Sequence, residues 1–236
     1  MSSRKMKVKV KKKKINIKRI VITLLIFLCI FGVSNYLINL PITNIYVLGN
    51  DLISDKEIIE LAELDNYPSF IKTYFKDYNK LLTKNEYIKE VEVTRKIFGK
   101  IYLNIEEKKP LFFYNEKIIL STSEQVINKY NLNNLPYIKN DITSVYHKFI
   151  EKYLLVEPKV SYKISEIEYV PNGIDKERFL LTMTDANYVY ITLAKIEKLN
   201  KYNTIVSELN NKKGIVYLDS GDYIEIKDWH KSLLII

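Results

Sequence analysis

The segments ITNIYVLGNDLISDKEI at residues 42–58 and YIKEVEVTRKIFGKIYLNIEEKKPL at residues 87–111 carry the patterns that decide the fold. In the first, the alternation of apolar and polar residues over 43–49 predicts a strand that closes in a turn. In the second, alternating segments on both sides of Phe98-Gly99 predict a β-hairpin. These patterns therefore predict three strands within about 65 residues.

Two helices are expected between the first strand and the hairpin. Ser54 and Glu57 have the spacing of a capping box, and the helix that they begin is expected to run to about Glu63. A second helical stretch, around residues 74–82, would place four apolar side chains along one stripe: Phe75, Tyr78, Leu81 and Leu82. The order strand–helix–helix–strand–strand predicts a small α+β unit in which two helices cover one face of a three-stranded sheet.

The remainder of the chain, from residue 111, is expected to be mainly β with two helices. Apolar residues at helical spacing predict those helices at residues 142–154 and 194–209. Strand patterns occur at 163–171, 178–184, 188–192, 215–218 and 222–226. The last two strands are joined by Asp219-Ser220-Gly221, a turn composition.

The amino-terminal region predicts a membrane anchor. Residues 20–40 carry no charge, and about 20 apolar residues are needed to cross a bilayer. Residues 1–19 contain ten basic side chains and no acidic one, which predicts a cytoplasmic amino terminus. The basic residues expected to set this topology are Lys11, Lys12, Lys13, Lys14, Lys18 and Arg19. A cleaved signal peptide is the alternative, although no A-x-A-like cleavage site follows the apolar run.

Composition excludes several classes of protein. The 217 residues after position 19 carry 27 basic and 28 acidic side chains, so the excess charge is confined to the tail and does not indicate nucleic-acid binding. The single cysteine, Cys29, excludes a disulfide framework, and the six glycines cannot form a dinucleotide fingerprint or a P-loop. The sequence contains no motif for a catalytic, cofactor-binding or metal site, and we expect none.

The quoted segments resemble the POTRA domain of the bacterial division proteins of the FtsQ/DivIB family. The residues that fall on the family pattern and that we assign to the POTRA motif are Ile45, Val47, Gly49, Asn50, Arg95, Glu106 and Pro110. The family usually turns with a proline where this chain has Phe98-Gly99. The later elements are similar in order to the β domain of the same family, including Leu135-Pro136 and the Asp219-Ser220-Gly221 turn.

The resemblance implies an α+β chain with a single N-terminal transmembrane helix, a POTRA-like β-α-α-β-β domain and a mainly antiparallel β domain with two helices. The expected boundaries are a basic cytoplasmic tail at 1–19, the transmembrane helix at 20–40, the POTRA domain at 42–111, the β domain at 112–227 and a C-terminal tail at 228–236.

The resemblance also implies a non-catalytic scaffold of the divisome. Its expected partners are FtsL-like and FtsB/DivIC-like bitopic division proteins, together with the septal peptidoglycan synthase complex. The expected location is the cell membrane at the septum, with the C terminus extracytoplasmic. The alternatives are a membrane-anchored extracytoplasmic enzyme and a POTRA-containing assembly or transport component. The POTRA unit is expected to recruit other proteins, and a plain spacer is the alternative.

The family implies that the last strand pairs with a strand of the FtsB/DivIC-type partner. The corresponding residues here are Leu218, Asp219, Ser220, Gly221, Asp222, Tyr223, Ile224, Glu225 and Ile226. Alternation predicts that Tyr223 and Glu225 point one way and that Ile224 and Ile226 point toward the core. Proline at Tyr223 or Glu225 would prevent partner binding if the lost N–H faces the partner. The alternative is an unpartnered edge kept soluble by Asp222, Glu225 and Lys227.

Overall fold

The structure, a computed structural model, describes residues 16–208 and 212–226. The predictions made for Lys11 to Lys14 and for the tail at 228–236 lie outside these residues. The chain separates into two compact units. Of the described residues, one unit comprises 16–48, 55–82 and 92–104, and the other comprises 49–54, 83–91, 105–208 and 212–226.

Helix α1 (Ile17–Ile38) agrees with the apolar segment expected from the sequence. It has 22 residues and a mean hydropathy of 2.4 over its most apolar window, so it is long and apolar enough to cross a membrane. At 1.5 Å per residue it is about 33 Å long, close to the thickness of a bilayer core. Lys18 and Arg19 lie in its first turn.

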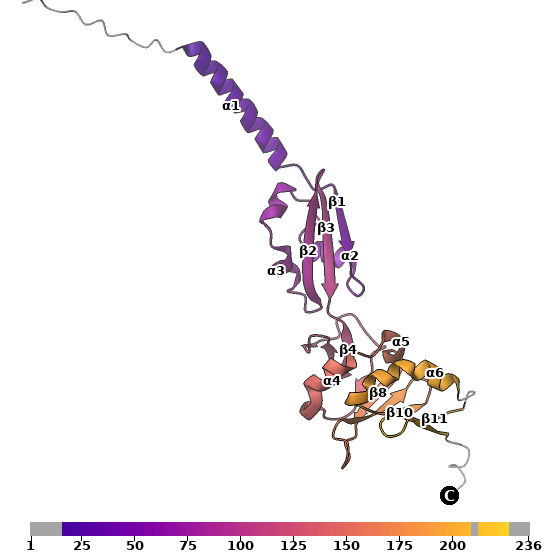
Figure 1. Cartoon of the computed structure of the whole chain (residues 1–236). Coiled ribbons are helices and arrows are strands. Elements are labelled where there is room, and N and C mark those ends of the chain that lie inside the picture. The colour runs from indigo at the N-terminus through magenta and orange to yellow at the C-terminus, as the bar shows by residue number, and fades with distance from the viewer. Residues whose placement is uncertain (1–15, 209–211, 227–236) are drawn as a thin grey trace, which may run out of the picture. The chain divides into compact units, whose positions relative to one another are not determined.

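The first sheet has three strands in the order β1-β3-β2 (Figure 1). Strand β1 (Asn44–Leu48) runs parallel to β3 (Lys100–Glu107), and the register begins with Asn44 opposite Lys100. Strand β2 (Ile88–Lys96) precedes β3 and pairs with its other side. Helix α2 (Asp55–Leu61) and two short helices, η1 (Ile71–Phe75) and α3 (Tyr78–Leu82), lie between β1 and β2 in the chain. The predicted order of the strands is confirmed, whereas three helical segments and not two lie between β1 and β2.

The continuous helix predicted at 74–82 is wrong. Lys76 has an extended ψ of 133°, which ends η1, and the side chain of Asp77 accepts a hydrogen bond from the N–H of Lys80 at 3.0 Å to begin α3. Because of this break, Phe75 does not lie on the same apolar face as the other residues of the predicted stripe. Tyr78 and Leu82 are buried, whereas Phe75 is 86% exposed. The polar residues at the break carried this signal in the sequence.

The second sheet has nine strands, and its pairing is mixed but mainly antiparallel. The strand order is β12-β11-β10-β9-β8-β7-β4-β5-β6. Its strands are β4 (Pro110–Tyr114), β5 (Lys117–Leu120), β6 (Gln125–Val126), β7 (Tyr137–Ile138), β8 (Ile164–Tyr169), β9 (Arg178–Met183), β10 (Tyr188–Thr192), β11 (Gly214–Tyr217) and β12 (Tyr223–Ile226). The predicted fold class, an apolar helix followed by an α+β and a β-rich region, is confirmed.

Helices pack against this sheet around one apolar core. They are η2 (Thr143–Val145), α4 (Tyr146–Tyr153), α5 (Pro158–Ser161), η3 (Leu193–Lys201) and α6 (Tyr202–Ser207). The helix expected at 194–209 is therefore a 3-10 helix that continues as a short α-helix, and the sequence did not predict α5. Phe149 of α4 meets Phe112 and Phe179 in the core, with ring centroids 5.3 and 4.8 Å apart.

Candidate partner-binding edge

Strands β11 and β12 form the hairpin that the sequence predicts, and β12 is the last strand in the sheet order. The two strands are antiparallel, with Tyr217 opposite Tyr223 and Gly214 opposite Ile226. Within residues 16–208 and 212–226, no strand pairs with the outer side of β12. Its backbone therefore presents an edge of the kind that accepts another strand.

Hydrogen bonds of the neighbouring strand determine which amides of β12 face outward. The Leu218 N–H donates to the Tyr190 carbonyl of β10 at 2.9 Å, so Leu218 directs its backbone away from β12. Successive residues of a strand direct their backbone groups to alternate sides, so Ile215 and Tyr217 face β12. Their register partners, Glu225 and Tyr223, face back toward β11. The outward amides are those of Ile224 and Ile226.

A buried asparagine supports this assignment. Asn187, in the turn between β9 and β10, is fully buried, and its Oδ1 accepts a hydrogen bond from the N–H of Gly214 at 3.0 Å. Gly214 therefore also directs its N–H away from β12. This agrees with the alternation along β11, because Gly214 lies two positions before Val216 and four positions before Leu218. The proline positions considered from the sequence, Tyr223 and Glu225, thus face the hairpin and not the open edge.

Side chains on one face of the hairpin form a ladder of tyrosines. The rings of Tyr190 and Tyr217 stack with centroids 5.3 Å apart, and those of Tyr217 and Tyr223 stack at 4.5 Å. The Arg178 guanidinium lies 3.9 Å from the centroid of the Tyr190 ring. The ladder runs from β10 to the edge strand, where Tyr223 is half exposed.

The prediction that Ile224 and Ile226 both point to the core is correct for only one of them. Ile224 packs against the core cluster, whereas Ile226 is half exposed. The residue opposite Ile226 is Gly214, which has no side chain to cover it. A Cβ at Gly214 would lie 2.5 Å from the carbonyl oxygen of Glu225, so the close approach of the strands requires glycine here.

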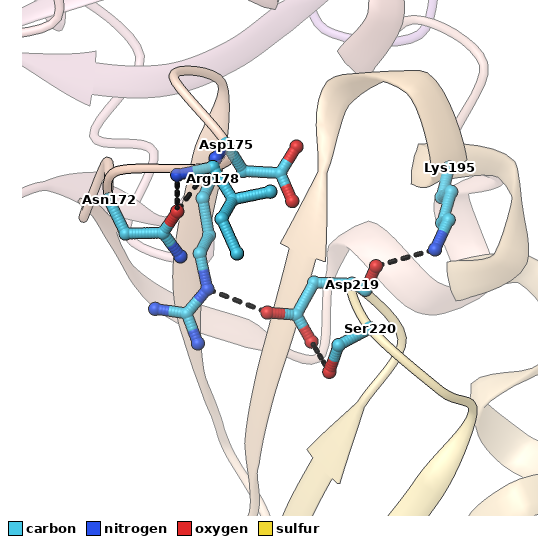
Figure 2. A network of polar contacts seen from close by, with 7 residues as sticks. Asn172, Asp175, Arg178, Lys195, Asp219 and Ser220 are labelled. Carbon is cyan, nitrogen blue, oxygen red and sulfur yellow. Dashed lines mark hydrogen bonds and ion pairs between the residues drawn. The ribbon is translucent and has the colours of Figure 1, made fainter.

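Three basic side chains hold the turn between β11 and β12. The Nε of Arg178, at the start of β9, donates to the Asp219 carboxylate at 2.6 Å, and the Ser220 hydroxyl donates to the same carboxylate (Figure 2). The Lys195 ammonium donates to the Asp219 carbonyl, and Lys198 pairs with Asp222. The turn is thereby fixed to β9 and η3.

The basic side chains around the turn lower the pKa of two carboxyl groups, those of Asp219 and Asp222. Burial disfavours ionisation of Asp219, but the hydrogen bonds from Arg178 and Ser220 and the charge of Arg178 outweigh it, so its pKa lies below the ordinary value. The hydrogen bond from Lys198 lowers the pKa of Asp222. Both carboxylates are therefore ionised at neutral pH, and they pair with Arg178 and Lys198.

Sequence reasoning found the hairpin but missed the side chains that hold it. Arg178, Asn187 and Lys195 were not assigned a role, although each is polar and adjoins an apolar strand or helix. Arg178 is 41 residues from Asp219 in the chain. The sequence shows the turn composition around Asp219, but it does not show the strand order. The pairing of Arg178 with Asp219 therefore has no local signal in the sequence.

Arg95 is a motif residue of the first unit with both hydrogen bonds and ring contacts. Its Nη2 donates to the Thr73 carbonyl at 2.7 Å and its Nε donates to the Thr73 hydroxyl at 3.2 Å, which fastens η1 to β2. Its guanidinium also lies 4.9 and 5.5 Å from the ring centroids of Tyr74 and Tyr78. The arginine therefore has a structural role, because planar donors and two rings fix its position.

The other motif residues have separate local roles. Gly49 has a φ of 80°, the left-handed conformation expected for the turn after the first strand. The Asn50 side chain donates to the Ile53 carbonyl at 2.8 Å, and Glu106 pairs with Lys89 at 2.6 Å on the surface. Ile45 and Val47 are half-buried on β1, and Pro110 begins β4.

Glu107, which was not among the motif residues, accepts hydrogen bonds from the N–H groups of Leu52 and Ile53 at 2.8 and 2.9 Å. This carboxylate satisfies backbone donors just before α2, a role typical of acidic residues near the start of a helix. Glu107 and Glu106 have different partners, because successive residues of a strand point to opposite faces.

The described residues contain no cluster of three or more His, Cys, Asp or Glu side chains that could hold a metal ion. A hollow of about 550 Å³ in the second unit is lined by Asn133, Asn134, Leu135, Tyr137, Tyr162, Ile164, Ser165, Glu166 and Thr184. Its carboxylate, on Glu166, pairs with Lys139 at 3.1 Å. The Ser165 hydroxyl donates to the Thr182 carbonyl at 2.9 Å, so it is not bonded to the Glu166 carboxylate, and this arrangement is not that of a nucleophile activated by a base.

The comparison with protein families gives a match that covers the first sheet and the few residues before it. Residues 40–108 match the family of FtsQ-type POTRA domains. The matched segment begins just after α1 and ends at the end of β3.

Similarity to characterised proteins extends over most of the chain. The cell division protein DivIB of Bacillus subtilis is 27% identical over 196 residues, which cover 78% of this chain and 73% of that protein. DivIB of Brevibacillus brevis is 28% identical over 188 residues, covering 75% and 71%. This chain is similar to DivIB proteins, and its residues 40–108 match FtsQ-type POTRA domains.

Two further comparisons are also with DivIB proteins. DivIB of Bacillus anthracis is 26% identical over 229 residues, which cover 91% of this chain and 85% of that protein. The major extracytoplasmic domain of DivIB from Geobacillus stearothermophilus, in its trans isomer, covers 44% of this chain and 96% of its own, with 16% identity and a TM-score of 0.36. The similarity to DivIB proteins supports a role in cell division, and α1 fits membrane anchoring.

Proposed function

We propose that this chain is a non-catalytic, single-pass scaffold of the divisome that organises and regulates septal peptidoglycan synthesis. Its basic tail would lie in the cytoplasm and both sheets outside, because basic flanks remain inside. The proposal is supported by the similarity to DivIB cell division proteins, by the FtsQ-type POTRA segment and by the apolar helix α1. Its partners would be FtsL-like and FtsB/DivIC-like bitopic proteins, with the septal peptidoglycan synthase complex, at the division septum.

The FtsB/DivIC-like partner would add a strand to β12. The observation that carries this proposal is an edge strand whose outward amides belong to Ile224 and Ile226 and whose turn is held by Arg178 and Lys195. Main-chain pairing supplies affinity in such complexes, while side chains select the partner. The half-exposed Tyr223 ring ends the ladder and offers a planar surface to an added strand.

Proline substitution in the full chain, held in lipid nanodiscs, tests this mode. Ile226→Pro removes an outward N–H from an exposed edge position, where proline is tolerated, so stability should change little while affinity for the purified FtsB/DivIC-like partner falls about tenfold or more. Glu225→Pro is the matched control: it removes an inward N–H and should destabilise the hairpin itself. Undiminished affinity of the Ile226→Pro variant would exclude strand addition.

The POTRA segment would recruit other division proteins. Deleting residues 42–110 while retaining α1 and the second sheet should abolish enrichment at midcell, whereas normal localisation of this variant would indicate a spacer. Depletion of the chain separates the scaffold from the enzymatic alternative. Failed septation, together with co-purification of the two bitopic partners, is expected, and hydrolytic activity of the purified protein would contradict a non-catalytic role.

A further inference from the structure

One end of the first unit exposes a group of large apolar side chains. They come from three segments that are separate in sequence, and each has more than half of its surface exposed: Tyr67, Tyr74, Phe75, Ile97 and Phe98. Such a concentration of exposed apolar side chains usually marks a surface that contacts a protein or a membrane. Their position relative to α1 decides between the two.

Hydrogen bonds tie two of these segments to the residues that leave α1. The Phe70 N–H donates to the Leu40 carbonyl at 2.8 Å, and the Ile42 N–H donates to the Pro68 carbonyl at 3.0 Å. The Ser69 hydroxyl donates to the Ile38 carbonyl, the last residue of α1. The loop that carries Tyr67 and leads into η1 therefore lies directly at the end of the helix.

The turn between β2 and β3 lies at the same place. The Thr43 N–H donates to the Gly99 carbonyl at 2.8 Å, and its hydroxyl donates to the Phe98 carbonyl at 2.6 Å. Thr43 is five residues beyond Ile38, which limits the separation from the helix end to about 17 Å. The parallel register of β1 and β3, beginning at Asn44 and Lys100, places this turn at the end of the sheet where the chain enters from α1.

Phe98 is an unusual residue for this turn. Its φ is 65°, and a bulky side chain in the left-handed region is uncommon and carries a local energetic cost. The side chain is 80% exposed, so core packing does not offset that cost. Asparagine or glycine would suit the backbone better. The exposed ring therefore serves neither the turn nor the core of this unit.

We propose that this end of the first unit docks on the outer surface of the bilayer in which α1 is anchored. Phe75, Ile97 and Phe98 would enter the boundary between headgroups and acyl chains, and Tyr67 and Tyr74 would lie at the headgroup level, where aromatic side chains concentrate in membrane proteins. The exposed Lys72 and Lys96 would face lipid phosphates, partly offset by Asp65 and Asp77.

This arrangement also depends on Arg95. The guanidinium holds Thr73, and Phe75 follows two residues later, so the arginine fixes η1 where its apolar side chains meet the membrane. The inference does not rest on the proposed partner of β12. It adds a second contact to the bilayer, which limits the orientations that the first unit can adopt relative to the membrane.

Lipid quenching of tryptophan fluorescence in the full chain tests the proposal. In a Trp229→Phe background, which removes the single tryptophan, Ile97→Trp reports on the docked end. Leu48→Trp is the matched control, because Leu48 is also exposed and lies opposite Asn104 at the other end of the same strand pair. The protein is reconstituted in phosphatidylcholine and phosphatidylglycerol vesicles with bromine on the acyl chains.

Quenching of Ile97→Trp is expected to exceed that of Leu48→Trp by about twofold or more. Adding Phe75→Ser and Phe98→Asn should reduce it toward the control, since the apolar contact is lost while asparagine accepts the left-handed turn. Equal quenching at the two positions would overturn the inference and leave this end as a protein-docking surface. Strong quenching that survives loss of both phenylalanines would also overturn it, by showing mere proximity to the anchor.

Discussion

The β2–β3 and β11–β12 hairpins have turns of opposite character. The first exposes Ile97 and Phe98 and places Phe98 in a left-handed conformation, whereas the second buries the Asp219 side chain against Arg178. The first therefore presents apolar side chains, and the second fixes its turn and presents backbone amides. The difference suits the two contacts that we propose: one with the bilayer and one with another strand. Substitutions that affect one hairpin and not the other test this comparison.

The largest effect is expected from Arg178→Ala. The Asp219 carboxylate is almost completely buried, so removing Arg178 leaves a buried charge without its ionic partner and should lower the free energy of unfolding by about 3 kcal/mol. Urea denaturation of the full chain measures it. Lys198→Ala, which breaks an exposed pair with Asp222, is the control and should have little effect. Equal losses in the two variants would contradict a buried clamp.

The next effect concerns the strand contact itself. Gly214→Ala would push a Cβ against the Glu225 carbonyl and separate β11 from β12, at a cost of about 2 kcal/mol. Gly173→Ala is the matched control, because no atom lies within 4 Å of the added Cβ. Denaturation midpoints of the two variants should differ clearly. If both remained as stable as the parent chain, the close packing of this hairpin would be disproved.

A smaller effect is expected in the first unit. Arg95→Lys keeps the charge but loses the planar donors to Thr73 and the stacking on Tyr74, so unfolding should become easier by about 1–2 kcal/mol. Lys72→Arg, at an exposed position of η1, should leave stability unchanged. A denaturation experiment with both variants checks this, and an unchanged Arg95→Lys protein would remove the arginine from the account of η1.

The pH dependence of the second hairpin follows from Asp219. Its pKa is lower in the folded than in the unfolded chain, so its contribution to stability is present above the unfolded value of about 4 and is lost as pH falls through the folded value. Asp219→Asn should therefore flatten the stability profile between about pH 5 and pH 2. Parallel profiles for the two proteins would show that the carboxylate is not linked to folding.

The sequence predicted those parts of the fold whose signal is local. The alternation around Val93 and Leu103, the apolar run of α1 and the turn at Asp219 each identify an element without knowledge of its neighbours. The prediction of one helix at 74–82 was wrong because the apolar periodicity in the sequence continues across Lys76, where the backbone is extended. Periodicity alone does not detect a one-residue break.

The candidate site was predictable as a segment but not as a geometry. Its strand and turn were visible in sequence, whereas the direction of each amide in β12 depends on the bond from Leu218 to Tyr190, which belongs to another strand. The same holds for the clamp, since Arg178 and Asp219 meet only through the strand order. Long-range pairing determines both features, and a single sequence does not reveal it.

Amide hydrogen exchange along β12 tests the central claim most directly. In the free full chain, the N–H groups of Tyr223 and Glu225 should be protected by β11, while those of Ile224 and Ile226 should exchange quickly. Adding the FtsB/DivIC-like partner should slow exchange at Ile224 and Ile226 by about tenfold or more and leave the other two little changed. Unchanged exchange at Ile224 and Ile226 in a saturated complex would contradict strand addition at this edge.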